Sequence, residues 1–113
     1  MLSKKYRFHS RGGVRSTYQN GKNIRETKIS LVFAPNSRQK QRYAVVVSKK
    51  VEKTAVGRNR IRRRLYEAIR QEQPRVKMPV DCIFVVYAKD LMGMDFKDIQ
   101  SLVHNLLKEA DIL

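Results

Sequence analysis

The sequence predicts one compact domain of the α+β class, and three observations lead to this prediction. A chain of 113 residues is long enough to bury a real hydrophobic core within one domain. Some of its segments carry apolar residues at helical spacing, whereas others alternate or run continuously apolar, as strands do. No internal repeat, long linker or low-complexity tail interrupts them. Residues 1–113 are therefore expected to fold as a single domain.

The N-terminal part of the chain predicts a basic arm followed by a short helix. Residues 1–9 contain several lysine and arginine side chains, and we expect them to form the arm. Ser10 is placed to cap the helix, and Gly21 would follow its last turn. This helix should depend on the packing of Val14 and Tyr18, because glycines near its start weaken it by about 1 kcal/mol each.

Three later segments predict strands, and a helix closes the chain. Residues 27–34 alternate apolar and polar side chains, as a half-buried strand does. Residues 42–48 are rich in valine, and residues 81–88 form a continuous β-rich run long enough for a central strand. The last helix is expected to start near Asp95, a candidate N-cap with Asp98 three residues on. Its apolar face would bury Phe96, Ile99, Leu102, Val103, Leu106 and Leu107.

Residues 54–71 predict an amphipathic helix that carries six arginines. Its narrow apolar stripe consists of Ile61, Leu65, Ala68 and Ile69. The line opposite that stripe consists of Asn59, Arg63, Tyr66 and Arg70. The two edges of the stripe carry Arg58 and Arg62 on one side and Arg60 and Arg64 on the other. Guanidinium groups bind phosphate in bidentate fashion and a tyrosine adds a stacking surface, so this helix predicts binding to a polyanion.

The charge of the whole chain favours the same partner. The net charge is +15, and residues 1–80 hold 22 basic and 4 acidic side chains. A solvated helix face is the usual explanation of a charge run, but Glu67 is the only nearby countercharge on this helix. Without a partner the repulsion among its arginines would go unrelieved. RNA or DNA is therefore the expected partner.

Other features limit the class of protein. No apolar run approaches the ~20 residues of a membrane-spanning helix, and the N-terminus does not lead into the apolar region of a signal peptide. The single Cys82 rules out an internal disulfide and fits a reducing cytosol, so we expect a cytoplasmic protein without a membrane partner. His9 and His104 are far apart in sequence, and Asp95 with Asp98 is explained by capping. We expect neither catalytic residues nor a metal site in the protein itself.

The middle of the chain carries an ordered set of motifs. A strand that ends in Ser48-Lys49-Lys50 is followed by a short loop and a helix that opens with Arg58-Asn59-Arg60. This set resembles the signature of the bacterial ribonuclease P protein component. The resemblance extends from about Lys4 to Leu107. Each motif alone would be weak evidence for it, but the ordered set is strong.

The resemblance implies a fold and an activity. Family members have the element order α-β-β-β-α-β-α around a four-stranded sheet, with an unusual left-handed βαβ crossover. Residues 27–48 would then supply the early strands. The implied activity is that of a ribonucleoprotein whose RNA removes the 5′ leader of precursor tRNA. That hydrolysis depends on Mg²⁺, which we expect the RNA and the substrate to hold. The implied partners are the catalytic RNA and the leader, with no obligate protein partner.

The resemblance also implies which residues act. Those expected to bind RNA are Arg7, Lys49, Lys50, Arg58, Asn59, Arg60, Arg62, Arg63, Tyr66 and Arg70. A cleft between the first helix and the sheet would take the leader, with Tyr18 as the stacking residue and Val14, Ser30 and Val32 beside it. Two features depart from the family pattern, because Tyr66 replaces a basic residue and Val14 an aromatic one. Leader stacking is therefore expected to rest on Tyr18 alone.

Three other functions fit the same composition less well. A ribosomal protein or general RNA-binding module would have the same charge, but it has no reason to keep the Ser-Lys-Lys and Arg-Asn-Arg motifs together. A DNA-binding protein would usually present its helix in a helix-turn-helix or similar frame, and none is evident. A stand-alone nuclease would need clusters of acid–base residues or metal ligands.

Overall fold

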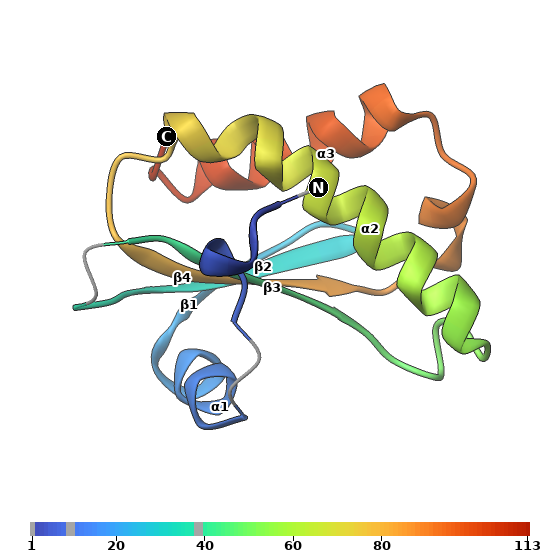
Figure 1. Cartoon of the computed structure of the whole chain (residues 1–113), viewed down its shortest axis with the longest axis horizontal. Coiled ribbons are helices and arrows are strands. Elements are labelled where there is room, and N and C mark those ends of the chain that lie inside the picture. Colours follow the sequence, from blue (N-terminus) through green and yellow to red (C-terminus); the bar gives the residue numbers. More distant parts are fainter. Residues whose placement is uncertain (1, 9–10, 38–39) are drawn as a thin grey trace.

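One four-stranded sheet carries helices on both of its faces in the computed structural model, which describes residues 2–8, 11–37 and 40–113 (Figure 1). The strands are β1 (Lys22–Arg25), β2 (Ile29–Pro35), β3 (Arg42–Val47) and β4 (Val80–Val86), in the spatial order β1-β2-β4-β3. The helices of the described part are α1 (Arg11–Asn20), α2 (Ala55–Glu72) and α3 (Phe96–Glu109). The predicted α+β class and the order α-β-β-β-α-β-α are confirmed.

The chain crosses the sheet once through a helix. β3 and β4 are parallel neighbours in which Val45 is the partner of Phe84, and α2 connects them. The other pairings, β1 with β2 and β2 with β4, are antiparallel. This order places β3 at an edge of the sheet, directly beside the helix that follows it. The left-handed sense of this crossover stays a prediction.

Two hydrophobic cores lie on opposite faces of the sheet. The larger one packs α2 and α3 against side chains such as Leu31 and Phe84, which are fully buried. The smaller one, under α1, contains Phe8, Val32, Ala44 and Ile83. Alternate residues of β2, β3 and β4 therefore serve different cores, and α1 covers only part of its face (Figure 1).

The basic helix forms for local reasons that the sequence carries. The hydroxyl of Thr54 accepts a 3.0 Å hydrogen bond from the backbone N–H of Gly57, which caps the first turn of α2. The same hydroxyl donates to the carboxylate of Glu52, at 2.5 Å. Ile61 and Leu65 are fully buried against the sheet. The predicted helix over residues 54–71 is confirmed to within one residue at each end.

The structure corrects one prediction in the N-terminal half and shows how the predicted basic arm is placed. The first strand lies at Lys22–Arg25, before residues 27–48, because a short edge strand needs only pairing with β2 and shows no apolar alternation of its own. The described part of the predicted basic arm, residues 2–8, packs against the rest of the fold. Leu2 and Phe8 are 2% and 4% exposed, and Arg7 forms a parallel bridge with Tyr43 of β3. Ser10, the expected helix cap, lies outside the described residues.

Candidate nucleic-acid interface

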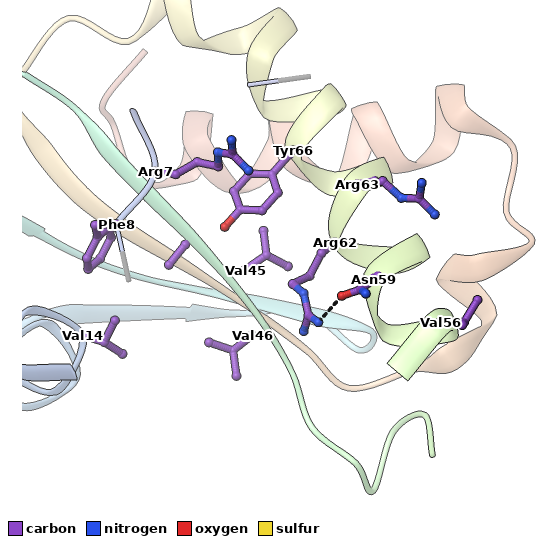
Figure 2. Close-up of a pocket in the computed structure, with 11 residues that line it drawn as sticks. Arg7, Phe8, Val14, Val45, Val46, Val56, Asn59, Arg62, Arg63 and Tyr66 are labelled. Atoms are coloured by element: carbon purple, nitrogen blue, oxygen red, sulfur yellow. Dashed lines mark hydrogen bonds between the residues drawn. The ribbon is translucent and has the colours of Figure 1, made fainter. Parts of the chain in front are cut away.

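A cleft of about 670 Å³ opens beside the edge strand β3, between α1 and α2 (Figure 2). The N-terminal segment, α1, β3 and α2 all contribute side chains to its wall. Those side chains belong to Arg7, Phe8, Val14, Ala44, Val45, Val46, Val56, Asn59, Arg62, Arg63 and Tyr66. The sequence motif at the start of α2 is thus brought next to the apolar surface of the sheet edge.

Positive charge is concentrated on one side of the cleft. Arg62 and Arg63 come from α2 and Arg7 from the N-terminal segment, and none of the lining residues is acidic. Arg62 donates a 2.5 Å hydrogen bond to Oδ1 of Asn59, and Figure 2 shows both side chains extending from α2 towards Val46. Guanidinium groups in this arrangement present donors to an anion inside the cleft.

The guanidinium of Arg7 lies over the ring of Tyr66. Its guanidinium carbon lies 5.5 Å from the ring centroid, a cation–π distance, and Figure 2 shows the two side chains next to each other. The Nε of Arg7 is buried and has no hydrogen-bond partner among the described residues. Such a buried atom is out of reach of a ligand, but the side chain of Arg7 also lines the cleft and carries further N–H donors. Arg7 is therefore suited to bind an anion that enters the cleft.

The remainder of the wall is apolar. Phe8, Val14 and Val46 belong to or pack against the smaller core, and their surfaces face the cleft. Arg42 holds Phe8 in place, with its guanidinium carbon 4.7 Å from the ring centroid. Arg42 in turn donates hydrogen bonds of 2.8 and 2.7 Å to the carboxylate of Asp81, which raise the pKa of the guanidinium further. Guanidinium groups and a fixed apolar surface therefore lie side by side in the cleft.

The prediction that Tyr66 lies in an exposed basic line is wrong. Tyr66 is 4% exposed and belongs to the larger core, and burial raises the pKa of its hydroxyl. The reason is tertiary, since the N-terminal segment pairs beside β3 and covers this flank of α2. Tyr66 is among the residues that line the cleft, but a ring so deeply buried cannot serve as an open stacking surface for a base.

Besides Arg62, which bonds to Asn59, three of the six arginines of α2 bind parts of the protein. Arg58 donates to the backbone carbonyls of Glu52 and Lys53, at 3.0 and 2.9 Å. Arg70 forms a 2.6 Å ion pair with Glu67, and its hydrogen bond is the largest of the causes that lower the pKa of that carboxyl to about 2.

Arg64, the third, reaches another segment of the chain. Its guanidinium donates to the carbonyls of Leu91 and Met92, at 3.2 and 2.6 Å, and to that of Met94. These bonds hold the short helix η3 (Lys89–Met92) against α2. Arg60 and Arg63 are exposed, and so are Lys49 and Lys50 in the turn after β3, but of these only Arg63 lines the cleft.

The structure divides the four residues expected to bind a leader. Val14 lines the cleft, whereas Tyr18 is 44% exposed and lies outside it. Ser30 and Val32 are 0% and 4% exposed, so the expectation that their side chains face a ligand is wrong. α1 packs over β2 and covers Ser30 and Val32. The sequence pattern of one strand cannot show that another element covers it.

Sequence reasoning also missed residues of the site. Phe8 and Val46 were not identified as site residues, and both line the cleft. Val56 was not identified either, although it is 76% exposed and lines the same cleft. A signal existed for Val56, because an apolar side chain on the polar side of a helix has no core to enter.

Two kinds of feature are absent from the described residues, a metal-binding cluster and a membrane-spanning helix. Within residues 2–8, 11–37 and 40–113, no group of three or more His, Cys, Asp or Glu side chains lies close enough to hold a metal ion. In the same ranges no helix combines the length and the hydropathy needed to cross a bilayer.

Comparison with known proteins gives one consistent result. The family model described as Ribonuclease P matches residues 2–111. The chain is 31% identical to the ribonuclease P protein component of Synechococcus sp. (strain JA-2-3B'a(2-13)), over 100% of this chain and 87% of that protein. It is 36% identical to that of Clostridioides difficile (strain 630), over 87% and 85%.

Solved structures agree on the fold. The RNase P protein of Staphylococcus aureus superimposes with a TM-score of 0.82 at 23% identity, over 95% of this chain and 96% of that one. The RNase P protein of Thermotoga maritima gives 0.81 at 23% identity, over 91% and 96%.

Proposed function

This chain belongs to the ribonuclease P protein family, and from that premise we propose how its residues assist tRNA processing. As a ribonuclease P protein component it works with RNA. In our proposal α2 binds the catalytic RNA, and the cleft beside β3 receives the single-stranded 5′ leader of precursor tRNA. The RNA subunit hydrolyses the phosphodiester bond, and the protein is the non-catalytic subunit that makes the reaction efficient.

The observation that best supports this proposal is that cationic and apolar side chains line the same cleft. Arg7, Arg62 and Arg63 can donate hydrogen bonds to phosphates, while Phe8 and Val46 offer a fixed apolar surface in the same cleft. A duplex presents mainly phosphates and keeps its bases stacked inside, whereas a single strand exposes both phosphates and base faces. The mixed wall therefore fits a single strand better than a duplex.

The outward side of α2 suits the catalytic RNA. Arg60 and Arg63 are exposed there, and the exposed Lys49 and Lys50 extend the positive surface into the turn after β3. Each phosphate that such side chains neutralise releases condensed counterions, which favours binding and makes it dependent on salt. Arg62 and Arg63 would lie between two polyanions, the catalytic RNA and the leader, and would lower the repulsion between them.

In our proposal the RNA and the substrate bind the Mg²⁺. Phosphate oxygens are suitable ligands for this ion, which usually keeps several water molecules and demands few protein groups. The part of this chain is electrostatic, since its arginines reduce the Mg²⁺ concentration that assembly of RNA and substrate requires. No side chain of the protein is given a role in proton transfer.

Leader cleavage at low Mg²⁺ tests the proposal. Precursor tRNA and the catalytic RNA from the same source are incubated with and without the protein, and with Arg62→Ala/Arg63→Ala. We expect the wild-type protein to stimulate cleavage and the double variant to lose that stimulation. If the protein binds RNA tightly but does not stimulate an RNA that is active at high Mg²⁺, a general RNA-binding role replaces this one.

A further inference from the structure

A second basic surface lies at the other end of α2 from the Arg-Asn-Arg motif. Two adjoining depressions of about 460 and 540 Å³ open there beside α3, on the side of the sheet that α2 and α3 cover (Figure 1). Arg75 and His104 line both depressions. The lysine and arginine residues that line them are all exposed. The basic residues of this surface, here called the α3 basic surface, are Arg75, Lys77, Lys97, His104 and Lys108.

The charges of α3 and its surroundings are separated between faces. Residues 81–113, all within the described part of the chain, contain three basic and six acidic side chains, so this part is acidic overall. Two of the three basic ones, Lys97 and Lys108, nevertheless line the depressions, and none of the six acidic ones does. Eleven residues, or about three helical turns, separate the two lysines, which places them on one face of α3. The side chains between them on that face can all form hydrogen bonds, and they belong to Gln100, Ser101, His104 and Asn105.

Among the described residues that line the depressions, Glu72 at the end of α2 is the only acidic one. Its carboxylate is bound inside the protein, because the residue is 2% exposed. One oxygen lies 2.6 Å from Nδ1 of His104, and the other accepts a 3.3 Å hydrogen bond from Arg75. These contacts orient both partners at the rim of the depressions. The side chain of Arg75 is still 67% exposed, so it keeps N–H donors for an anion from outside.

The α3 basic surface differs chemically from the cleft beside β3. It offers ammonium, guanidinium, amide and hydroxyl groups, which in nucleic-acid complexes contact phosphate and sugar. None of the described residues that line it is Phe, Tyr or Trp. Single strands are usually held by stacking on aromatic rings, whereas a duplex keeps its bases inside and presents its phosphates. This surface therefore suits a paired segment of RNA.

The two basic surfaces are too far apart to bind the same phosphates. Thirteen residues of α2 separate Asn59 from Glu72, which is about 20 Å along the helix axis. Successive phosphates on one strand of a duplex such as B-DNA are only about 3.4 Å apart along its axis. RNA must therefore present separate groups of phosphates to the two ends of α2.

We propose that the α3 basic surface binds the phosphate backbone of a paired segment of the catalytic RNA, apart from the segment bound by the Arg-Asn-Arg end of α2. This inference rests on the proposed function for the identity of the RNA, and it does not involve the leader. Lys97 and Lys108 neutralise phosphates directly, and Glu72 positions Arg75 and His104 beside them. α2 then connects two segments of the RNA, and binding at both of its ends fixes how they lie relative to each other.

Binding titrations of the catalytic RNA at several salt concentrations test this surface. Lys97→Ala/Lys108→Ala removes two exposed side chains, so the fold should be retained. We expect the affinity of this double variant to fall about tenfold, and its slope of log K against log salt to become shallower by about one to two units. Lys22→Ala/Lys40→Ala is the matched control, because it removes the same charge from exposed residues outside both surfaces. Equal affinities and slopes of the two double variants would overturn the inference.

Directed cleavage in the assembled holoenzyme identifies the bound segment. A source of hydroxyl radicals is attached to Ser101→Cys in the α3 basic surface or to Val56→Cys in the cleft. Cys82 is fully buried and should not take up the reagent. We expect the two labels to cut different segments of the catalytic RNA, with the cuts from Ser101→Cys in paired RNA.

Two results of the cleavage experiment would contradict the inference. One is that Ser101→Cys cuts nothing or only the segment that Val56→Cys also cuts. The other is that its cuts are confined to precursor tRNA, which would make the substrate the partner of this surface. In both cases the proposed function is retained. It fails as well only if the wild-type protein does not bind the catalytic RNA.

Discussion

The side chain of Asn59 accepts a hydrogen bond from Arg62, three residues later on α2, over 2.5 Å. This bond directs the guanidinium of Arg62 along the helix and into the cleft, where it lies opposite Val46 (Figure 2). The spacing of three residues is the one that places two side chains on the same face of a helix. The Arg-Asn-Arg motif thus contains, in its asparagine, a residue that positions an arginine outside the motif.

Removing Arg62 or Arg63 should weaken RNA binding and its dependence on salt. We expect Arg62→Ala and Arg63→Ala each to lower affinity for the catalytic RNA and to make the slope of log K against log salt shallower by about one unit or less. The measurement is a binding titration at several salt concentrations. Arg64→Ala removes the same charge from the same helix and should leave the slope close to wild type. An unchanged slope in both Arg62→Ala and Arg63→Ala would mean that these side chains are merely solvated.

Arg64 should instead contribute to stability. We expect Arg64→Ala to lower the free energy of unfolding by about 2 kcal/mol, because it leaves the carbonyls of Leu91, Met92 and Met94 without their charged donor. Arg64→Lys should restore only part of this, since an ammonium lacks the planar fork that reaches several carbonyls. Urea unfolding measures the difference, and Arg63→Ala should stay within about 0.5 kcal/mol of wild type. Equal stability of all three variants would contradict this role.

The sequence predicted those elements whose signals are local. The helix α2 was found because its apolar stripe repeats at helical spacing within a short stretch of the chain. Strand β1 was missed because its only apolar residue is Ile24, and pairing with β2 holds it in the sheet. Asp95 occupies the predicted N-cap position of α3, but its side chain makes no capping bond.

The candidate site was harder to predict because its walls come from distant segments. The motif arginines were identified, but a helical projection cannot show that the N-terminal segment buries Tyr66. Nor can it distinguish Arg64, which binds carbonyls 27 to 30 residues away, from Arg63, which is exposed. The packing of α1 decides that Ser30 is buried while Tyr87 next to it is accessible.

Gly21 should not tolerate a side chain, and the reason is space. A Cβ at this position would lie 2.5 Å from the carbonyl oxygen of Thr17 and 2.7 Å from that of Phe33, where α1 meets β2. Both atoms belong to the backbone, so they cannot rotate away. We expect Gly21→Ala to lower the free energy of unfolding by about 2 kcal/mol, in the range of overpacked sites.

Gly93 offers the matched control for Gly21. A Cβ there would meet nothing within 4 Å, and its φ of −111° is open to any residue. Gly93→Ala should therefore be neutral or stabilise by up to about 1 kcal/mol. Thermal or urea unfolding of the two variants checks the pair. Similar losses in both would show that the contact at Gly21 is not the cause.

The free energy of unfolding should fall at alkaline pH, and Cys82 is one source. Cys82 is fully buried, and burial raises the pKa of its thiol far above the usual value. The thiol ionises above about pH 8.5 in the unfolded chain but stays protonated in the folded one, so the unfolded state then binds fewer protons. Stability is lost as pH rises, by up to about 1.4 kcal/mol per pH unit for this group. Tyr43, whose Cα pairs with that of Cys82 and whose pKa burial also raises, adds to the loss above about pH 10.

Cys82→Ala separates the thiol from the other groups. The variant should start from a lower stability, because the smaller side chain leaves space in the larger core. Between about pH 8.5 and pH 10 its free energy of unfolding should nevertheless fall less steeply than that of the wild type. Urea unfolding at a series of pH values gives both slopes. Parallel curves for the two proteins would contradict this prediction, because they would mean that the thiol ionises equally in the folded and unfolded states.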